Sequence, residues 1–160
     1  MLANRIPVFN KRAKRHLISH PKFYFFDAGV FRTIRPSGPL DSPHEIDGIV
    51  LENLIMQHLQ AWIAYHSNGN KLYYWRTKAC VEVDFIIYGP DTLVAIEVKN
   101  TTNIRSNDLK RLMSFRTDYP GASCFFLYRG KEKLMKNGIL CMPCDLFLEK
   151  LTPENRIELE

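Results

Sequence analysis

The sequence lacks the long apolar runs that a membrane protein requires. No segment approaches the roughly 18 consecutive apolar residues of a spanning helix. No charged start followed by an apolar stretch marks a signal peptide, and no internal repeat is present. With 160 residues, 46% of them apolar and 12% aromatic, the chain has enough material for one sizeable core. These features predict a cytoplasmic globular domain with no membrane partner.

Cysteine is scarce and poorly arranged for a metal or redox site. The four cysteines are Cys80, Cys124, Cys141 and Cys144. The C-x-x-C of 141–144 lies near the end of the chain, whereas a thioredoxin-like motif stands near the start of a βαβ unit. No second C-x-x-C completes a four-cysteine zinc site. A structural role is therefore favoured over a redox or zinc role.

Acidic residues are almost absent from the first 36 positions. This segment holds eight Lys or Arg and one acid, whereas the rest of the chain holds fourteen and sixteen, within a total net charge of +5. Its basic run can neutralise nucleic-acid phosphates, although such a run is at least as often a linker or a solvated helix face. The residues of the run predicted to bind nucleic acid are Lys11, Arg12, Lys14 and Arg15.

Three regions are predicted from the punctuation of the chain. Residues 1–21, broken by two prolines, are expected to be a basic linker or a connection to an absent upstream module. Residues 22–151 are expected to form the folded domain, and residues 152–160 a polar tail.

The most informative stretch is a predicted hairpin. Two runs rich in β-branched and aromatic residues, 81–88 and 93–99, flank a turn of Gly89-Pro90-Asp91-Thr92. If the loop closes symmetrically, Tyr88 lies opposite Leu93 and Asp84 lies opposite Glu97. The same register places Glu82 opposite Lys99. Because side chains alternate along a strand, these four polar residues are expected on one face and an apolar surface on the other.

The predicted pairing of Asp84 with Glu97 requires an explanation, because opposed like charges destabilise a sheet. Either a cation lies between them or one carboxyl group is protonated. Mg2+ or Mn2+ bound by carboxylates and water would explain the pair, with Lys99 beside the water. This constellation is typical of metal-dependent phosphodiester cleavage. The alternative is a surface ladder of salt bridges.

A long helix is expected to bring a third acid to the sheet. Ser42-Pro43-His44-Glu45 has the features of a capping box, and apolar spacing extends the helix to about His66. Glu52 lies on or beside the apolar stripe, where an acid is costly unless it is paired or bound to a metal. The alternative for Glu52 is a boundary residue that contacts a backbone amide or a lysine.

The remaining elements complete an α/β order. Strands are expected at 72–76, 124–128 and 139–142, and helices at 106–119 and 145–151, while 23–26 is expected to be a short strand or a buried anchor. The short connections between the last hairpin strand, the helix and the next strand imply a right-handed parallel crossover.

The order helix, three strands, helix, strand resembles the PD-(D/E)XK nuclease superfamily, whose domains have a restriction-endonuclease-like core. The resemblance implies a central mixed sheet flanked by helices. It also implies catalytic roles for Glu52, Asp84, Glu97 and Lys99, with Asp84, Glu97 and the Val98 carbonyl as metal ligands. Val83 replaces the nominal proline of the motif.

A second resemblance covers nearly the whole chain. KFYFFDAGVFR (22–32), GIVLEN (48–53), LYYWRTKACVEVDFII (72–87) and IEVKN (96–100) look like a C-terminal domain of unknown function found in many prokaryotic AAA-type ATPases. This family is itself regarded as PD-(D/E)XK-like. The resemblance implies an upstream or separate P-loop ATPase module, but this chain contains no G-x-x-x-x-G-K-S/T motif.

Two principal functions are therefore expected. The first is a Mg2+- or Mn2+-dependent nuclease-like domain that cleaves or binds DNA and works with a P-loop ATPase module. The second is a non-catalytic module that binds nucleic acid or protein and regulates an AAA-type ATPase. A pure oligomerisation domain is a third alternative, and a homo-oligomer is compatible with each of these.

Overall fold

The computed structural model describes residues 3–11, 20–25, 27, 29–30, 33, 38, 42–66 and 68–157. These residues form eight strands, three α-helices and one short 3-10 helix, η1. In chain order they are β1 (Ala3–Ile6), β2 (Lys22–Phe25), α2 (Pro43–His66), β3 (Lys71–Arg76), β4 (Glu82–Gly89), β5 (Thr92–Val98), η1 (Ser106–Leu109), α3 (Lys110–Asp118), β6 (Ser123–Tyr128), β7 (Leu134–Lys136), β8 (Ile139–Pro143) and α4 (Cys144–Lys150).

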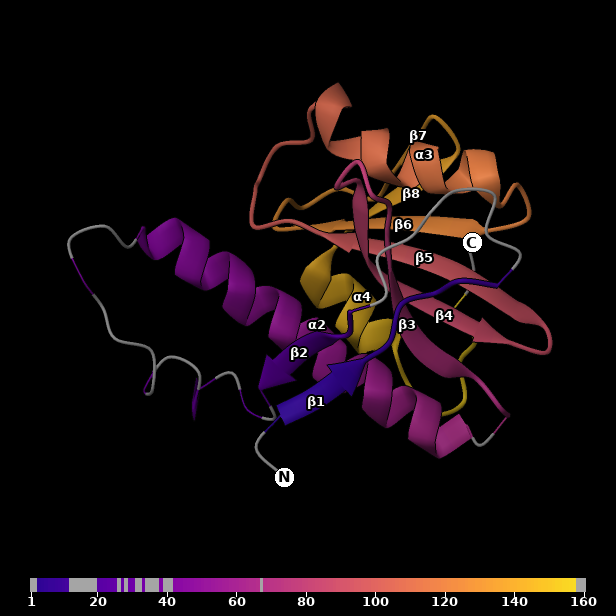
Figure 1. Cartoon of the computed structure of the whole chain (residues 1–160). Coiled ribbons are helices and arrows are strands. Elements are labelled where there is room, and N and C mark those ends of the chain that lie inside the picture. Colours follow the sequence, from indigo (N-terminus) through magenta and orange to yellow (C-terminus); the bar gives the residue numbers. More distant parts are fainter. Residues whose placement is uncertain are drawn as a thin grey trace.

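A six-stranded mixed sheet is the centre of the fold (Figure 1). Its strand order is β3-β4-β5-β6-β8-β7. The β3–β4 and β4–β5 pairs are antiparallel, β5–β6 and β6–β8 are parallel, and β7 returns antiparallel to β8. The α/β class, the central mixed sheet and the parallel pairing across α3 are thereby confirmed. The short edge strand β7 was not predicted.

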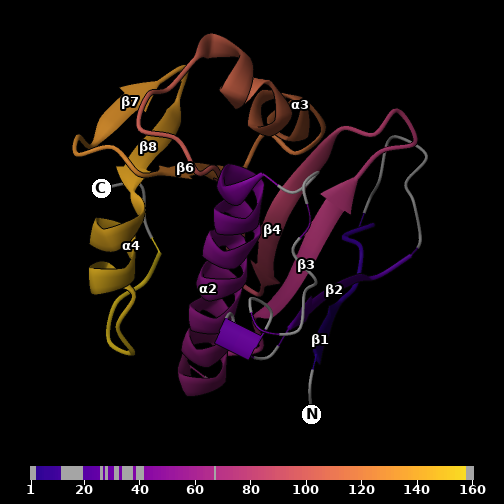
Figure 2. The same cartoon turned by 90° about the vertical axis from the view of Figure 1, so that its left-hand side faces the viewer.

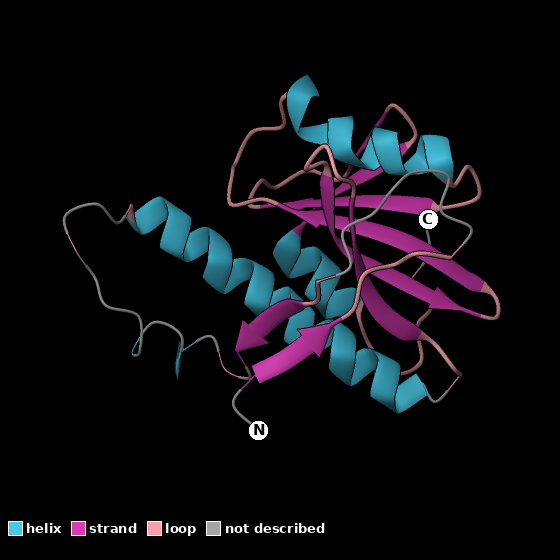
Figure 3. Cartoon of the chain, in the orientation of Figure 1, coloured by secondary structure: helices cyan, strands magenta, loops and turns pink. Residues whose placement is uncertain are grey.

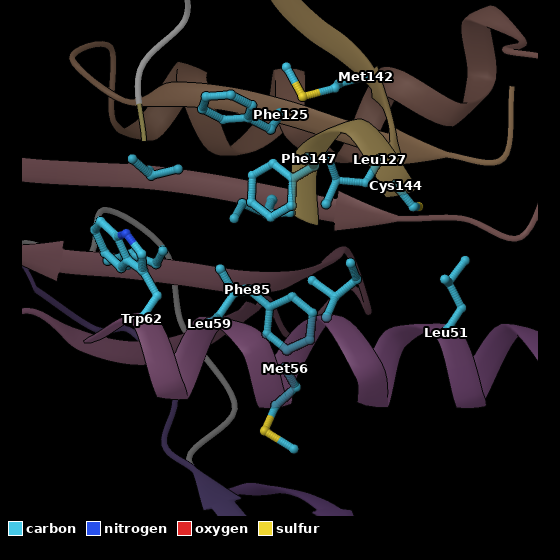
Figure 4. Close-up of a cluster of buried hydrophobic side chains, with 14 of the residues drawn as sticks. Leu51, Met56, Leu59, Trp62, Phe85, Phe125, Leu127, Met142, Cys144 and Phe147 are labelled. Atoms are coloured by element: carbon cyan, nitrogen blue, oxygen red, sulfur yellow. The ribbon is translucent and has the colours of Figure 1, made fainter. Parts of the chain in front are cut away.

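Helices cover both faces of the sheet (Figure 2). Helices α2 and α4 pack on one face, and Figure 4 shows Leu59 and Trp62 of α2 with Phe147 of α4 among the buried side chains of that layer. Helix α3 packs on the other face, where Leu112 and Phe115 are fully buried. Each face of the sheet is therefore covered by an apolar core.

The hairpin closes as predicted, but its open end separates. Gly89 pairs with Thr92 and Tyr88 with Leu93, and the same register continues to Phe85 and Ile96. Beyond that point Glu82 pairs with Arg76 of β3, while the Lys99 N–H donates to the Leu127 carbonyl of β6. The prediction that Glu82 lies opposite Lys99 is therefore wrong, because Glu82 pairs with β3 and Lys99 is hydrogen-bonded to β6.

The prediction that the hairpin has one polar face and one apolar face is also wrong. Val83 and Ile86 both lie in the core beneath α3, whereas Phe85 lies in the core beneath α2. The cause is an irregularity in the β3–β4 ladder: between the pairs Tyr73–Ile86 and Trp75–Val83, one residue of β3 faces two of β4. Such a bulge resets the alternation of side chains at Asp84. The polar residues consequently lie together at one end of the hairpin and do not cover one face of the sheet.

The N-terminal segment contributes structure that was not expected. β1 pairs antiparallel with β2, and this two-stranded sheet lies beside α2 (Figure 3). Val8 then bridges Tyr74 at the edge of the main sheet, and Phe9 is buried in the core beneath α3. Residues 3–9 therefore belong to the folded body.

The predicted start of helix α2 is confirmed. Helix α2 begins at Pro43, and the Ser42 carbonyl accepts hydrogen bonds from the N–H groups of Glu45 and Ile46. All four cysteines are free thiols; Cys124, Cys141 and Cys144 are buried and Cys80 is exposed. In the described part of the chain, no helix combines the length and apolarity needed to cross a membrane.

Candidate metal and nucleic-acid site

One cleft contains every residue predicted to be catalytic. The cleft has a volume of about 230 Å³ and lies where β4 and β5 separate, with α2 and α3 on either side. A second cavity, of about 440 Å³, shares Glu52, Val98 and Lys99 with it and extends along the start of α2. The lining residues of the first are Glu52, Asp84, Glu97, Val98, Lys99, Asn107, Asp108 and Arg111.

Asp84 is buried at the floor of this cleft. Its Oδ2 accepts a hydrogen bond of 2.9 Å from the Val98 N–H, and its Oδ1 lies 3.5 Å from the ammonium of Lys22. Burial and the neighbouring Glu52 carboxylate raise the pKa of Asp84 to about 7, against the opposing effect of Lys22. Asp84 therefore titrates near neutral pH in the absence of another cation.

Glu97 is the second buried carboxylate. Arg111 of α3 donates to its Oε1 at 2.8 Å, while its Oε2 is buried and has no hydrogen-bond partner in the described part of the chain. Burial and the charge of Asp84 raise the pKa of Glu97 well above its usual range, although Arg111 opposes them. A buried carboxylate oxygen without a partner is energetically costly, and a cation or water would relieve that cost.

Glu52, Glu82 and Asp84 form an acidic cluster around the ammonium of Lys22. The Nζ of Lys22 lies 2.6 Å from Oε1 of Glu52 and 2.8 Å from Oε1 of Glu82. The Tyr24 hydroxyl also donates to Oε1 of Glu52, at 2.5 Å. Burial alone would lower the pKa of Lys22, but the carboxylates of Asp84 and Glu52 outweigh it and raise that pKa. Lys22 is therefore firmly protonated within the cluster.

Lys99 is paired at the rim of the cleft. Its ammonium donates to Asp108 of η1, and about half of its side chain is exposed. Burial would raise the pKa of Asp108, but hydrogen bonds from Lys99 and from the Arg105 N–H lower it. The ion pair with Asp108 thus holds the Lys99 side chain at the rim of the cleft.

The donor set of the cleft fits a hard divalent cation in chemistry. Two buried carboxylates, Asp84 and Glu97, are coupled electrostatically, and one of their oxygens lacks a partner. Mg2+ is commonly bound by one or two carboxylates with water completing the octahedron. Within the described residues, no group of three or more His, Cys, Asp or Glu side chains is arranged to hold a metal ion. A bound ion would therefore depend first on these two carboxylates, because the Oε1 of Glu52 already contacts Lys22 and Tyr24.

The predicted nucleic-acid-binding run is only partly described. Lys11 is exposed at the end of the segment that follows β1. Arg12, Lys14 and Arg15 lie outside the described residues.

Sequence reasoning missed four residues of the site. Lys22, Tyr24 and Arg111 contact the predicted acids, and Asp108 is the ion-pair partner of Lys99. Lys22 and Tyr24 stand in the motif 22–32, but nothing in its spacing connects it to acids 30 and 60 residues away. No local pattern connects Arg111 to Glu97, which lies 14 residues earlier in the chain.

The comparisons with known proteins identify the domain family. Residues 47–147 match the model described as Domain of unknown function (DUF4143). The match covers more than half of the chain, so the protein belongs to this family. The matched segment includes Glu52, Asp84, Glu97 and Lys99 but begins after Lys22. No curated protein matches the chain.

Proposed function

We propose that this domain is a nuclease-like module of the PD-(D/E)XK type that acts on DNA with Mg2+ or Mn2+. The observation that carries the proposal is the burial of Asp84 and Glu97 in one cleft with Lys99 at its rim. Two carboxylates with raised pKa values and one unpartnered oxygen are unfavourable in the protein alone. Perturbed acids in a cleft are typical of functional sites.

The order of elements supports the same proposal. Helix α2, strands β3 to β5, helix α3 and strand β6 follow one another as in a restriction-endonuclease-like core. The acids lie on the first helix and on the second and third of these strands. The resemblance to domains carried by AAA-type ATPases adds a P-loop ATPase module as the proposed partner.

Each residue has a distinct proposed role. Asp84 and Glu97, with the Val98 carbonyl, would hold the cation, and Glu52 would be an outer or additional ligand. A divalent cation bound there would polarise an oxygen of the phosphodiester and lower the pKa of a bound water. Lys99 would orient that water and stabilise the charge that develops on the phosphate in the transition state. Arg111 fixes the Glu97 carboxylate through its 2.8 Å contact with Oε1.

A second candidate is a non-catalytic module that regulates an AAA-type ATPase. The observation that favours it is the internal pairing of the site: Lys22 contacts three carboxylates, Arg111 contacts Glu97, and Asp108 contacts Lys99. Such pairing satisfies most of the charges without a ligand. In this case the acids would be structural, and the cleft would present a protein or nucleic-acid surface.

Cleavage and cation binding separate the two candidates. The assay is cleavage of single-stranded and duplex DNA with Mg2+ or Mn2+, beside thermal unfolding in EDTA and in Mn2+. The nuclease proposal expects cleavage and stabilisation of the wild type by Mn2+, both lost in Glu97→Gln. Glu149→Gln, at an exposed acid of α4, is the control and should behave as the wild type. If the wild type cleaves neither single-stranded nor duplex DNA and gains no stability from Mn2+, the nuclease is excluded in favour of the regulatory module.

A further inference from the structure

Lys22 places a positive charge where the cleft would otherwise attract a metal ion. Its Nζ lies 2.6 Å from Glu52, 2.8 Å from Glu82 and 3.5 Å from Asp84. These carboxylates come from α2 and β4, and only about a quarter of the Lys22 side chain is exposed (26%). The ammonium thus serves as the counter-ion of the acidic cluster.

The β1–β2 sheet holds this lysine in place. Lys22 pairs with Ile6 across the two strands, and Ile6 and Tyr24 are both buried in the core that α2 covers. The Tyr24 hydroxyl contacts the same Glu52 oxygen as Lys22. The position of the ammonium is consequently set by the docking of a whole two-stranded sheet, shown beside α2 in Figure 1.

Asp84 is the residue that two cations would have to share. Its Oδ1 faces Lys22, its Oδ2 accepts from the Val98 N–H, and it is also a proposed ligand of a divalent ion. Mg2+ binds carboxylate oxygen at about 2 Å, so an ion on Asp84 would lie only a few ångströms from the ammonium. Two cations at that separation repel strongly in a partly buried site.

We infer that Lys22 is a tethered cation that competes with a divalent ion for Asp84, so that the β1–β2 sheet regulates metal binding in the cleft. The inference rests on the proposed function, because it concerns the cation of the same site. Displacement of Lys22 favours the ion, and by linkage a bound ion favours displacement of Lys22. The N-terminal strands are then an inhibitory element of the domain as well as part of its fold.

The test is calorimetric titration of the full chain with Mn2+. The wild type is compared with Lys22→Met and with Lys22→Met/Glu82→Gln, and cation-free stability is measured in EDTA for each. The double variant removes one carboxylate charge together with the ammonium. Its acidic cluster is therefore less repulsive, and it can be compared with the wild type if the single variant does not fold. Lys71→Met is the control, because Lys71 is exposed and pairs with Tyr88 near the turn of the hairpin, away from the cleft.

Loss of the competing charge should lower the Kd for Mn2+ by at least about tenfold in Lys22→Met, and by less in Lys22→Met/Glu82→Gln, where one carboxylate charge is lost as well. Lys71→Met should bind Mn2+ as the wild type does. Equal affinity of the wild type and the Lys22 variants would overturn the inference while leaving the proposed divalent site in place. No Mn2+ binding by any form would overturn both the inference and the metal-dependent function.

Discussion

The Nζ of Lys22 on β2 lies 2.6 Å from Oε1 of Glu52 on α2, although 30 residues separate the two in the chain. The contact joins the N-terminal two-stranded sheet to the helix that covers the main sheet. Because Glu52 also lines the cleft of Asp84 and Glu97, the same contact links the N-terminal strands to the candidate site. The stability of that junction and the properties of the site should therefore change together.

The Tyr24 hydroxyl tests the strength of this junction. Tyr24 is buried and donates to Glu52, so Tyr24→Phe leaves the ring in the core but removes one donor from a carboxylate. We expect the free energy of unfolding to fall by about 1–3 kcal/mol, as for hydrogen bonds to charged groups. Urea denaturation in EDTA measures the change.

The matched control is Tyr65→Phe, at the exposed end of α2. The Tyr65 side chain is 73% exposed, so the same chemical change should leave stability within about 0.5 kcal/mol of the wild type. Equal effects of the two substitutions would show that the Tyr24–Glu52 contact contributes nothing.

The elements with strong local signals were predictable from the sequence. Pro43 after Ser42 marks the start of α2, and the turn from Gly89 to Thr92 fixes the hairpin register near its closed end. In both cases residues a few positions apart determine the structure, through backbone restriction and turn geometry. The resemblance to the PD-(D/E)XK superfamily then implied catalytic roles for the acids on these elements.

The environment of the acids was not predictable in the same way. The bulge at Asp84 depends on pairing with β3, so simple alternation misassigned Val83. Lys22 reaches Glu82 across 60 residues, a contact that no local pattern records. Tertiary contacts decided each of these points.

Gly89 tests the closed end of the hairpin. A Cβ added at Gly89 would lie 1.8 Å from Oδ1 of Asn70 and 3.1 Å from its Cα, and Asn70 is buried. We expect Gly89→Ala to lower the free energy of unfolding by about 1–3 kcal/mol, as overpacking typically does. Gly121→Ala is the control, since a Cβ there meets nothing within 4 Å. Thermal unfolding of both variants decides the matter, and equal stability would contradict the predicted clash.

The basic N-terminal run makes a prediction about salt dependence. If Lys11, Arg12, Lys14 and Arg15 contact phosphates, replacing all four by Gln should weaken DNA binding. The slope of log affinity against log salt should become shallower by up to about 0.9 per lost contact, because fewer counter-ions are released. Fluorescence anisotropy with labelled duplex DNA at several salt concentrations measures this slope.

The control for this experiment removes the same number of charges from another part of the surface. An unchanged slope in the N-terminal variant, or the same change in both variants, would assign the run to a linker or a protein interface. The control residues are the exposed lysines Lys131, Lys133, Lys136 and Lys150.

The raised pKa of Asp84 predicts how the stability of the protein depends on pH. Its pKa is raised to about 7 in the folded protein, from 3.8, so the folded state binds the proton more tightly than the unfolded state. The cost of the buried charge is therefore absent below about pH 4, grows as the pH rises, and is fully present above about pH 7. Asp84→Asn retains an acceptor for the Val98 N–H but carries no charge.

We therefore expect Asp84→Asn, in EDTA, to match or exceed the wild type in stability at pH 8, with a smaller gain or none at pH 5. Denaturant unfolding at both pH values measures the difference, and Asp91→Asn, at the turn of the hairpin, is the control that should show no such dependence. If Asp84 is instead a structural partner of Lys22, the variant loses a charge-assisted contact and is less stable at pH 8. The two hypotheses thus predict opposite signs at pH 8, and added Mn2+ should stabilise only the wild type if the carboxylate is a ligand.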